Sequence, residues 1–341
     1  MQILERDGKS RRRFLEATLS ALGGAVSNRM VATCCPGSEA DGAAAGAKPD
    51  CVLCGQRPHR ISAALGLCAA CIRDRPAKAR PIVEAAHAKS RRAFGLPETP
   101  PRTKGGVVCG LCQAGCVLGE GERGYCGLRR VRRGRLEHLA GTPERGLLQW
   151  YRDALPTNCV ASWVCSGSRR AGYHNLAVFY ESCTFNCLYC QNWHFRKTSP
   201  ERARTMSAAE LASAANERTH CVCFFGGDPS SQMLHALAVG RLLAARGVAV
   251  CWETNGSARP GLVDEALELA LESGGCVKFD LKAWDESLHR ALTGHSNART
   301  LENFARAAKR ARERPDPPLV IASTLLVPGY VGAGEVAAIA R

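Results

Sequence analysis

The sequence contains no apolar run long enough to cross a lipid bilayer, so it predicts no membrane-spanning helix. Acidic residues are also in short supply, because 31 Asp and Glu face 46 Lys and Arg. The imbalance lies in residues 1–150, where 25 Lys and Arg stand against 13 Asp and Glu, or +12. Such a surface could meet nucleic acid, but we favour a solvated basic face, because the charge is mostly arginine in an alanine-rich chain.

The N-terminal residues 1–35 allow two interpretations. Arg11, Arg12 and the apolar residues after them are similar to a twin-arginine export signal. Glu16 inside the apolar stretch, Arg29 shortly after it and the lack of a small-x-small cleavage site argue against export. We therefore favour an amphipathic helix and a cytoplasmic location, with export as the alternative.

Nineteen cysteines, mostly in pairs or triplets at metal-ligand spacing, indicate reduced thiolates and not a disulfide framework. After a Gly- and Pro-punctuated linker at 36–50 comes a first group with two Cys-x2-Cys knuckles, which predict a structural zinc site. Beyond a basic, helical connector at 76–105, a second group lies in glycine-rich turns. Four thiols there fit zinc or an auxiliary iron–sulfur cluster, and we favour zinc. The first group is Cys51, Cys54, Cys68 and Cys71, and the second is Cys109, Cys112, Cys116 and Cys126.

A third group, Cys183, Cys187 and Cys190, directly follows the apolar run 176–180. Four-iron clusters normally take four thiolates, so three leave one iron open to a substrate or cofactor. An open iron predicts a catalytic site. Six further cysteines fit buried small hydrophobes better than another metal site, which stays the alternative for the first two of them: Cys159, Cys165, Cys221, Cys223, Cys251 and Cys276.

From residue 175 onward the sequence alternates strand and helix patterns, which predicts an α/β fold with a parallel sheet. The expected strands are 176–181, 221–226, 248–253, 276–281 and 319–327. The expected helices are 207–219, 230–246, 260–273, 285–313 and 333–341. Ligands gather at the C-terminal ends of strands in such sheets.

The expected strands end in residues suited to ligand binding. The first runs into the three-cysteine loop, and the second ends in two glycines, which let the backbone approach a ligand and present carbonyls to an ammonium group. Any one of these endings is common, but their combination predicts a single site. The endings after the cysteine loop are Gly226-Gly227-Asp228-Pro229, Glu253-Thr254-Asn255 and Asp280-Leu281-Lys282.

These motifs together resemble the radical S-adenosylmethionine (SAM) enzymes, which carry Cys-x3-Cys-x-aromatic-Cys on the loop after the first strand. Here Cys183, Cys187, Tyr189 and Cys190 match that motif. The resemblance implies a [4Fe-4S] cluster whose open iron binds the amino and carboxylate groups of SAM, with Tyr189 near the adenine. Gly226-Gly227-Asp228-Pro229 is similar to the family's Gly-Gly-Glu-Pro segment and implies backbone contact with the amino group of SAM.

Within the superfamily, several of the same strand ends resemble the pyruvate formate-lyase activating enzymes, and the second cysteine group resembles the AmmeMemoRadiSam-type branch. The activases imply a monovalent-cation site formed by Asp280 and by the acidic residue before Thr254, but Glu253 stands where they have Asp. The resemblance also implies a flavodoxin- or ferredoxin-like electron donor. The segments that carry the likeness are 187–193, 254–256, 280–282 and 325–329.

The resemblance implies a partial (β/α)6-type TIM barrel in residues 171–341. We count five strand–helix units where the group has six, and the last helix runs to residue 341, so we expect a truncated C-terminus or a more open barrel. The expected domain order is an N-terminal helix, a linker, a zinc module, a connector, a second cysteine-rich module and the barrel. Their ranges are 1–35, 36–50, 51–75, 76–105, 106–170 and 171–341.

The predicted function is reductive cleavage of SAM to a 5′-deoxyadenosyl radical that abstracts hydrogen from a substrate, most simply a protein in a glycyl-radical activase-like role. The alternatives are an RNA or small-molecule substrate, or a non-enzymatic metal protein that binds nucleic acid. Radical chemistry needs no histidine–carboxylate pair. We therefore expect His174, His194 and His295 to be structural or substrate-facing.

Overall fold

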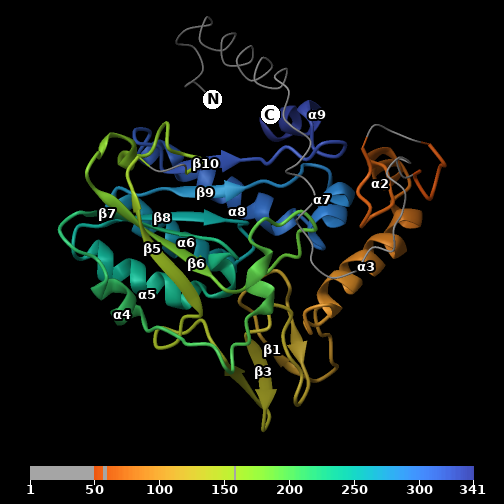
Figure 1. Ribbon diagram of the computed structural model, residues 1–341, viewed down its shortest axis with the longest axis horizontal. Coiled ribbons are helices and arrows are strands. Elements are labelled where there is room, and N and C mark those ends of the chain that lie inside the picture. The colour runs from red at the N-terminus through yellow and green to blue at the C-terminus, as the bar shows by residue number, and fades with distance from the viewer. Residues whose placement is uncertain (1–49, 57–59, 157–158) are drawn as a thin grey trace, which may run out of the picture. The chain divides into compact units, whose positions relative to one another are not determined.

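The computed structural model of the protein, shown in Figure 1, describes residues 50–56, 60–156 and 159–341. All of them belong to one unit. The expected N-terminal helix or export signal, and nearly all of the linker at 36–50, lie outside the described residues. Within the described part, no helix is long and apolar enough to span a membrane.

The main sheet has six strands in the order β10-β9-β8-β7-β6-β5. Strands β6 to β10 are parallel to one another, and they confirm the five expected strands and the α/β class. The edge strand β5 pairs antiparallel with β6 and was not expected, so the sheet begins before residue 171. The strands are β5 (Leu148–Ala154), β6 (His174–Tyr180), β7 (Thr219–Phe225), β8 (Ala249–Thr254), β9 (Val277–Asp280) and β10 (Val320–Ser323).

Helices follow the parallel strands and pack on one face of the sheet, as α5 and α6 do against β8 (Figure 1). The prediction of a single helix at 285–313 is wrong. The structure has two helices there, because Gly294 ends the first in a left-handed conformation with φ of 79°. The helices of this region are α4 (Ala208–Ser213), α5 (Met233–Ala244), α6 (Pro260–Ser273), α7 (Glu286–Thr293), α8 (Ala298–Arg310) and α9 (Ala333–Ile339).

The two faces of the sheet differ in chemistry because successive strand residues point to opposite sides. On β7, Val222 and Phe224 join the large apolar core that the helices cover. Cys221 and Cys223 alternate with them and pack with Cys251 and Cys276 on the other face. Polar and sulfur-bearing side chains are therefore collected on the face that the helices leave free.

The two cysteine-rich regions precede the sheet in the chain. The first group lies at α2 (Ala69–Asp74), which is followed by α3 (Pro76–Arg92), and both helices contact α7. The second group lies around two small antiparallel hairpins. Their strands are β1 (Val107–Val108), β2 (Val117–Leu118), β3 (Arg129–Arg132) and β4 (Arg135–His138).

Candidate functional site

The loop of Cys183, Cys187 and Cys190 follows the C-terminal end of β6 and is held by the end of α7. The amide of Asn186 donates to the carbonyl of Thr293 at 2.9 Å, and the amide of Leu188 donates to the carbonyl of Leu292 at 3.0 Å. The carbonyls at a helix C-terminus lack partners within the helix, so the loop satisfies two of them. These two hydrogen bonds fix the loop backbone against the end of α7.

A cavity of about 190 Å³, here called the strand-end cavity, lies where the parallel strands end. Every residue predicted for the cluster and SAM lines it except Pro229 and Thr254, which are buried. The structure thus brings together residues separated by up to about a hundred positions in the chain. The predicted residues that line it are Cys183, Cys187, Tyr189, Cys190, Gly226, Gly227, Asp228, Glu253, Asn255, Asp280 and Lys282.

Gly226 and Gly227 are required at the end of β7. Both have positive φ, at 61° and 56°. A Cβ on Gly227 would lie 2.0 Å from the carbonyl oxygen of Tyr180, and one on Gly226 would lie 2.0 Å from the ring of Phe179. Only glycine can bring the backbone this close to the neighbouring strand while lining the cavity.

Asp228 ties the ends of β7 and β8 together. Its buried carboxylate accepts hydrogen bonds from the amides of Ser230 at 2.7 Å and Asn255 at 2.6 Å, and burial raises its pKa to about 6. Asn255 in turn donates through Nδ2 to Thr184 at 2.8 Å and lies 3.8 Å from the Cys183 sulfur. The network therefore positions the first cysteine of the loop relative to β8.

The two carboxylates implied for a monovalent cation are each bonded by a lysine. Glu253 lies 2.9 Å from the ammonium of Lys278, and Asp280 lies 2.6 Å from that of Lys282. Lys278 was missed by the sequence analysis, and its side chain is only 3% exposed. The sequence could have placed Lys278 at this site. In a buried strand, a lysine between Val277 and Phe279 points to the same face as Asp280, because side chains alternate between the two faces.

Lys278 also contacts two thiols. Its ammonium donates to the sulfur of Cys159 at 2.9 Å and to that of Cys223 at 3.2 Å, and Cys159 donates to Glu253 at 3.3 Å. Burial lowers the pKa of Lys278, but Cys223 and Glu253 outweigh it and hold the pKa well above the usual value. Cys159 therefore belongs to a charged cluster beneath the strand-end cavity, in contrast to the expected apolar setting.

The donor set of the strand-end cavity fits the cluster and SAM. Three thiols line it, and burial raises the pKa of each, that of Cys187 to about 11, so binding of a metal must replace three protons. The hydroxyl of Tyr189 is buried at the same cavity and, within the described residues, has no hydrogen-bond partner. A buried hydroxyl without a partner is costly, so it marks a place for a polar ligand edge.

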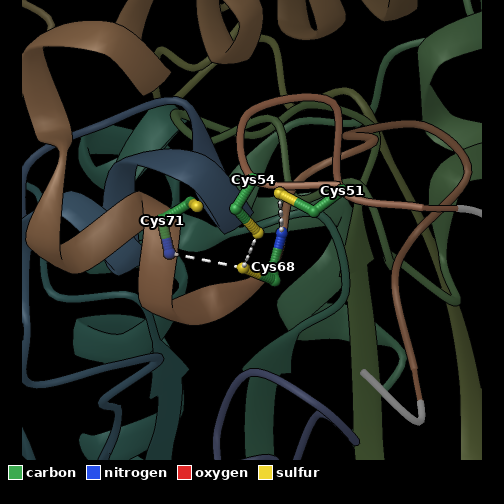
Figure 2. A group of neighbouring side chains, drawn as sticks. All are labelled: Cys51, Cys54, Cys68 and Cys71. Atoms are coloured by element: carbon green, nitrogen blue, oxygen red, sulfur yellow. Dashed lines mark hydrogen bonds between the residues drawn. The ribbon is translucent and has the colours of Figure 1, made fainter. Parts of the chain in front are cut away.

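The first cysteine group forms a compact four-thiol site (Figure 2). The sulfurs of Cys51, Cys54, Cys68 and Cys71 all lie within 4.8 Å of one another, and those of Cys54 and Cys68 are 3.9 Å apart. A tetrahedral zinc with Zn–S bonds of about 2.3 Å needs sulfurs roughly 3.8 Å apart. The group therefore has the dimensions of a single tetrahedral ion.

Backbone amides prepare this site for a metal. The amide of Cys68 donates to the Cys51 sulfur at 3.4 Å, and the amide of Cys71 donates to the Cys68 sulfur at the start of α2 (Figure 2). Burial raises the pKa of Cys51, but hydrogen bonds from the backbone of Cys68, Leu53 and Cys54 lower it to about 6. A thiolate near neutral pH is a good metal ligand.

The second cysteine group is looser. Cys109, Cys112 and Cys116 pack in one small core, while Cys126 packs in the next. Burial raises the pKa of Cys112, and the thiols of the other three raise it further. In the part of the chain that the structure describes, only the Cys51 group has at least three such ligand atoms within 4.8 Å of one another.

The three histidines considered above lie outside the strand-end cavity. His174 bonds Thr219 at 2.7 Å, and His194 stacks on Trp193. His295 is buried beside the ring of Phe185, and burial lowers its pKa to about 3. Their contacts fit structural roles.

Comparison with known proteins agrees with this geometry. Residues 177–332 match the sequence model of the Radical SAM superfamily. The isethionate sulfite-lyase activating enzyme of Oleidesulfovibrio alaskensis is 34% identical over 117 residues, which cover 34% of this chain and 35% of that protein. The pyruvate formate-lyase 1-activating enzyme of Escherichia coli is 28% identical over 132 residues, which cover 37% of this chain and 52% of that protein.

An uncharacterized protein of Methanocaldococcus jannaschii is 30% identical over 121 residues, or 32% of this chain and 31% of that protein. The chain thus spans between about a third and about half of the length of these curated relatives. The matched segment of the superfamily includes the cysteine loop and all the strand ends that line the cavity. This chain therefore contains an enzyme domain of the radical SAM superfamily.

Proposed function

We propose that the chain binds a [4Fe-4S] cluster through Cys183, Cys187 and Cys190 and uses it to cleave SAM reductively. The observation that carries this proposal is the convergence of the three thiols, the Gly226-Gly227 backbone and the Asp280–Lys282 pair in one cavity. When bound, the cluster would supply the one-electron reduction that cleaves SAM into methionine and a 5′-deoxyadenosyl radical, which is the species able to abstract hydrogen from a substrate.

Different residues of the strand-end cavity bind the cluster and the separate groups of SAM. The three cysteines hold the cluster and leave one iron for SAM. The backbone at Gly226 and Gly227 receives the amino group of SAM, Lys282 offers the cation for its carboxylate, and Tyr189 faces the adenine. Asp228, Thr254 and Asn255 keep the strand ends in place, since they bond one another and the loop and leave little freedom to bind directly.

We further propose that the sheet is part of a (β/α)6-type barrel, with five parallel strands in place and β5 on the outer edge of the first. The Cys51 group is proposed to hold a structural zinc, supported by its sulfur spacing. The Cys109 group is proposed to hold a second metal centre, of zinc or iron–sulfur type. The modules keep the proposed bounds 51–75, 76–105 and 106–170, apart from β5.

The proposed substrate is a protein, in a role like that of a glycyl-radical activase. Two relatives named for activating pyruvate formate-lyase and isethionate sulfite-lyase support it. A flavodoxin- or ferredoxin-like protein in the cytoplasm would supply the electron. An RNA or small molecule is the second candidate substrate, favoured by the basic first half of the chain.

Anaerobic reconstitution with iron and sulfide, followed by dithionite and SAM, tests the proposal. We expect 5′-deoxyadenosine and methionine in equal amounts, and an electron paramagnetic resonance signal of the reduced cluster that changes when SAM is added. Cys187→Ala is expected to abolish both, whereas Cys165→Ala, which removes a thiol outside the strand-end cavity, is expected to keep both. A yield of 5′-deoxyadenosine from Cys187→Ala equal to that from the unaltered protein would refute the proposal.

A further inference from the structure

A second cavity, of about 260 Å³, adjoins the strand-end cavity and is here called the basic cavity. Its walls come from the end of α3, the second cysteine region, the cysteine loop and residues 195–202. Five basic side chains line it, against one acidic side chain, Glu181. The basic residues are Arg91, Arg123, Arg196, Lys197 and Arg202.

Two of these arginines are buried without an acidic partner. Arg91 is 2% exposed, stacks on the ring of Tyr125 and donates to the carbonyls of Pro97 and Tyr125. Arg196 is 8% exposed and donates to Ser90 and to the carbonyl of Cys187 at 3.0 Å. Neutral oxygens satisfy the N–H groups but do not cancel the charge, and an uncompensated buried charge is costly.

The other charged residues of the basic cavity do not balance the positive charges of Arg91 and Arg196. Arg123 pairs with Glu201, but among the described residues Lys197 and Arg202 form no ion pair. Glu181 is already bonded by two neutral groups, Gln149 at 2.7 Å and Thr198 at 2.6 Å. Four cations of the cavity, Arg91, Arg196, Lys197 and Arg202, therefore have no carboxylate partner in its walls. Cys126 and Cys183 also line it, and their thiols carry negative charge only when they are ionised, as in metal binding.

The basic cavity meets the strand-end cavity along a shared wall. Cys183, Phe185, Phe195 and Arg196 line both. The rings of Phe185 and Phe195 offer apolar surface along this wall, and Arg196 presents a cation to both cavities. The strand-end cavity has its own cation, Lys282, which pairs with Asp280 at 2.6 Å.

From this arrangement we infer that the basic cavity binds the substrate by an anionic group, a carboxylate or a phosphate, and so holds a neighbouring C–H bond at the strand-end cavity. This inference rests on the proposed function, because it assigns the substrate side of the same site. Arg91 and Arg196 form the preorganised floor. Lys197, Arg202 and Arg123 supply the more accessible donors, and charge-assisted hydrogen bonds of this kind fix orientation as well as affinity.

Equilibrium binding of simple anions tests the inference without turnover. Reconstituted protein with saturating SAM and no reductant is titrated calorimetrically with inorganic phosphate and, separately, with malonate, at constant ionic strength in chloride. We expect one saturable site, and the preferred anion identifies phosphate or carboxylate chemistry. The double variant Lys197→Gln/Arg202→Gln is expected to weaken that affinity by about tenfold or more.

The matched control is Lys309→Gln, an exposed lysine on α8, which should bind the anion as the unaltered protein does. SAM affinity in the double variant should stay within about twofold. Absence of a saturable site for either anion, unchanged affinity in the double variant, or a loss that only accompanies loss of SAM binding would overturn the inference. Failure to form 5′-deoxyadenosine rejects the proposed function instead, because the anion titration needs no reductant.

Discussion

Replacing Lys278 with methionine tests how much the ion pair of Lys278 and Glu253, beneath the strand-end cavity, contributes to the free energy of unfolding. Methionine keeps most of the volume of the side chain and removes its ammonium. Lys278→Met leaves Glu253 without its cation at 2.9 Å and removes a donor from Cys159 and Cys223. The stem still fills the interior face of β9, so the main change is electrostatic.

The size of the effect follows from burial. Breaking one partner of a fully buried ion pair costs about 3–5 kcal/mol. The Glu253 side chain is 25% exposed and can be partly rehydrated, so we expect a loss of about 2–3 kcal/mol in the free energy of unfolding. Glu253→Gln alone also leaves a charge unpaired, whereas Glu253→Gln/Lys278→Met removes both charges. The double variant should therefore recover about 1–2 kcal/mol relative to the sum of the single changes.

Anaerobic urea unfolding of the reduced, zinc-loaded protein measures these values. Lys309→Met, an exposed lysine on α8, is the control and should change stability by less than about 0.5 kcal/mol. A second readout is SAM affinity in potassium chloride against tetramethylammonium chloride. The unaltered protein should be indifferent to the cation, and Lys278→Met should bind SAM better in potassium. A coupling energy near zero in the double-variant cycle, together with no response to potassium, would refute the reasoning.

Three further changes give distinct results. Gly227→Ala should lower SAM affinity by about tenfold or more, because its Cβ would meet the carbonyl oxygen of Tyr180 at 2.0 Å and its φ is 56°. Removing metal from the first cysteine group by a chelator, or by Cys54→Ser, should lower the melting temperature and the cluster content, because that module packs against Leu188 beside Cys187. Lowering the pH from about 6.5 to 4 should remove about 2–3 kcal/mol of stability through His87, whose pKa burial lowers to about 4.

Each of these changes has its own control. Gly261→Ala lies in α6 with open space around its Cβ position, so it should leave SAM affinity unchanged. Re-addition of zinc to the chelated protein should restore both the melting temperature and the cluster content, and a melting temperature indifferent to zinc would contradict the proposed site.

The pH effect has a specific origin in His87. In the neutral ring Nε2 donates to the carbonyl of Ala291 at 3.1 Å, and Nδ1 accepts from Asn186 at 3.0 Å. Protonation places a hydrogen on Nδ1 against the donor of Asn186. The folded-state pKa lies below the unfolded value, so the stability is fully present above pH 6.5 and is lost as the pH falls toward 4. His87→Gln should flatten the loss over this window, and an equally steep acid loss in that variant would exclude His87 as its source.

Local patterns predicted much of the fold correctly. The five parallel strands were evident because each is a short apolar run bounded by glycine or polar residues, and such runs need little tertiary context. The edge strand β5 was missed because Gln149, Arg152 and Asp153 interrupt its apolar pattern, and its place depends on pairing with β6. The break between α7 and α8 depends on the left-handed conformation of Gly294, which the sequence alone does not require.

The sequence by itself determined which residues lie at the strand ends, because the period of a strand and the spacing of a loop are local properties. It thus located the cysteine loop, the Gly226-Gly227 turn and the Cys51 group, while the Cys109 group stays a prediction. The tertiary structure decided which charged side chains lie close together. Lys278 pairs with Glu253, and Arg91 and Arg196 line the same cavity. These contacts join segments up to about a hundred residues apart, and only the pairing of β8 with β9 and the packing of α3 beside the cysteine loop bring them within reach of one another.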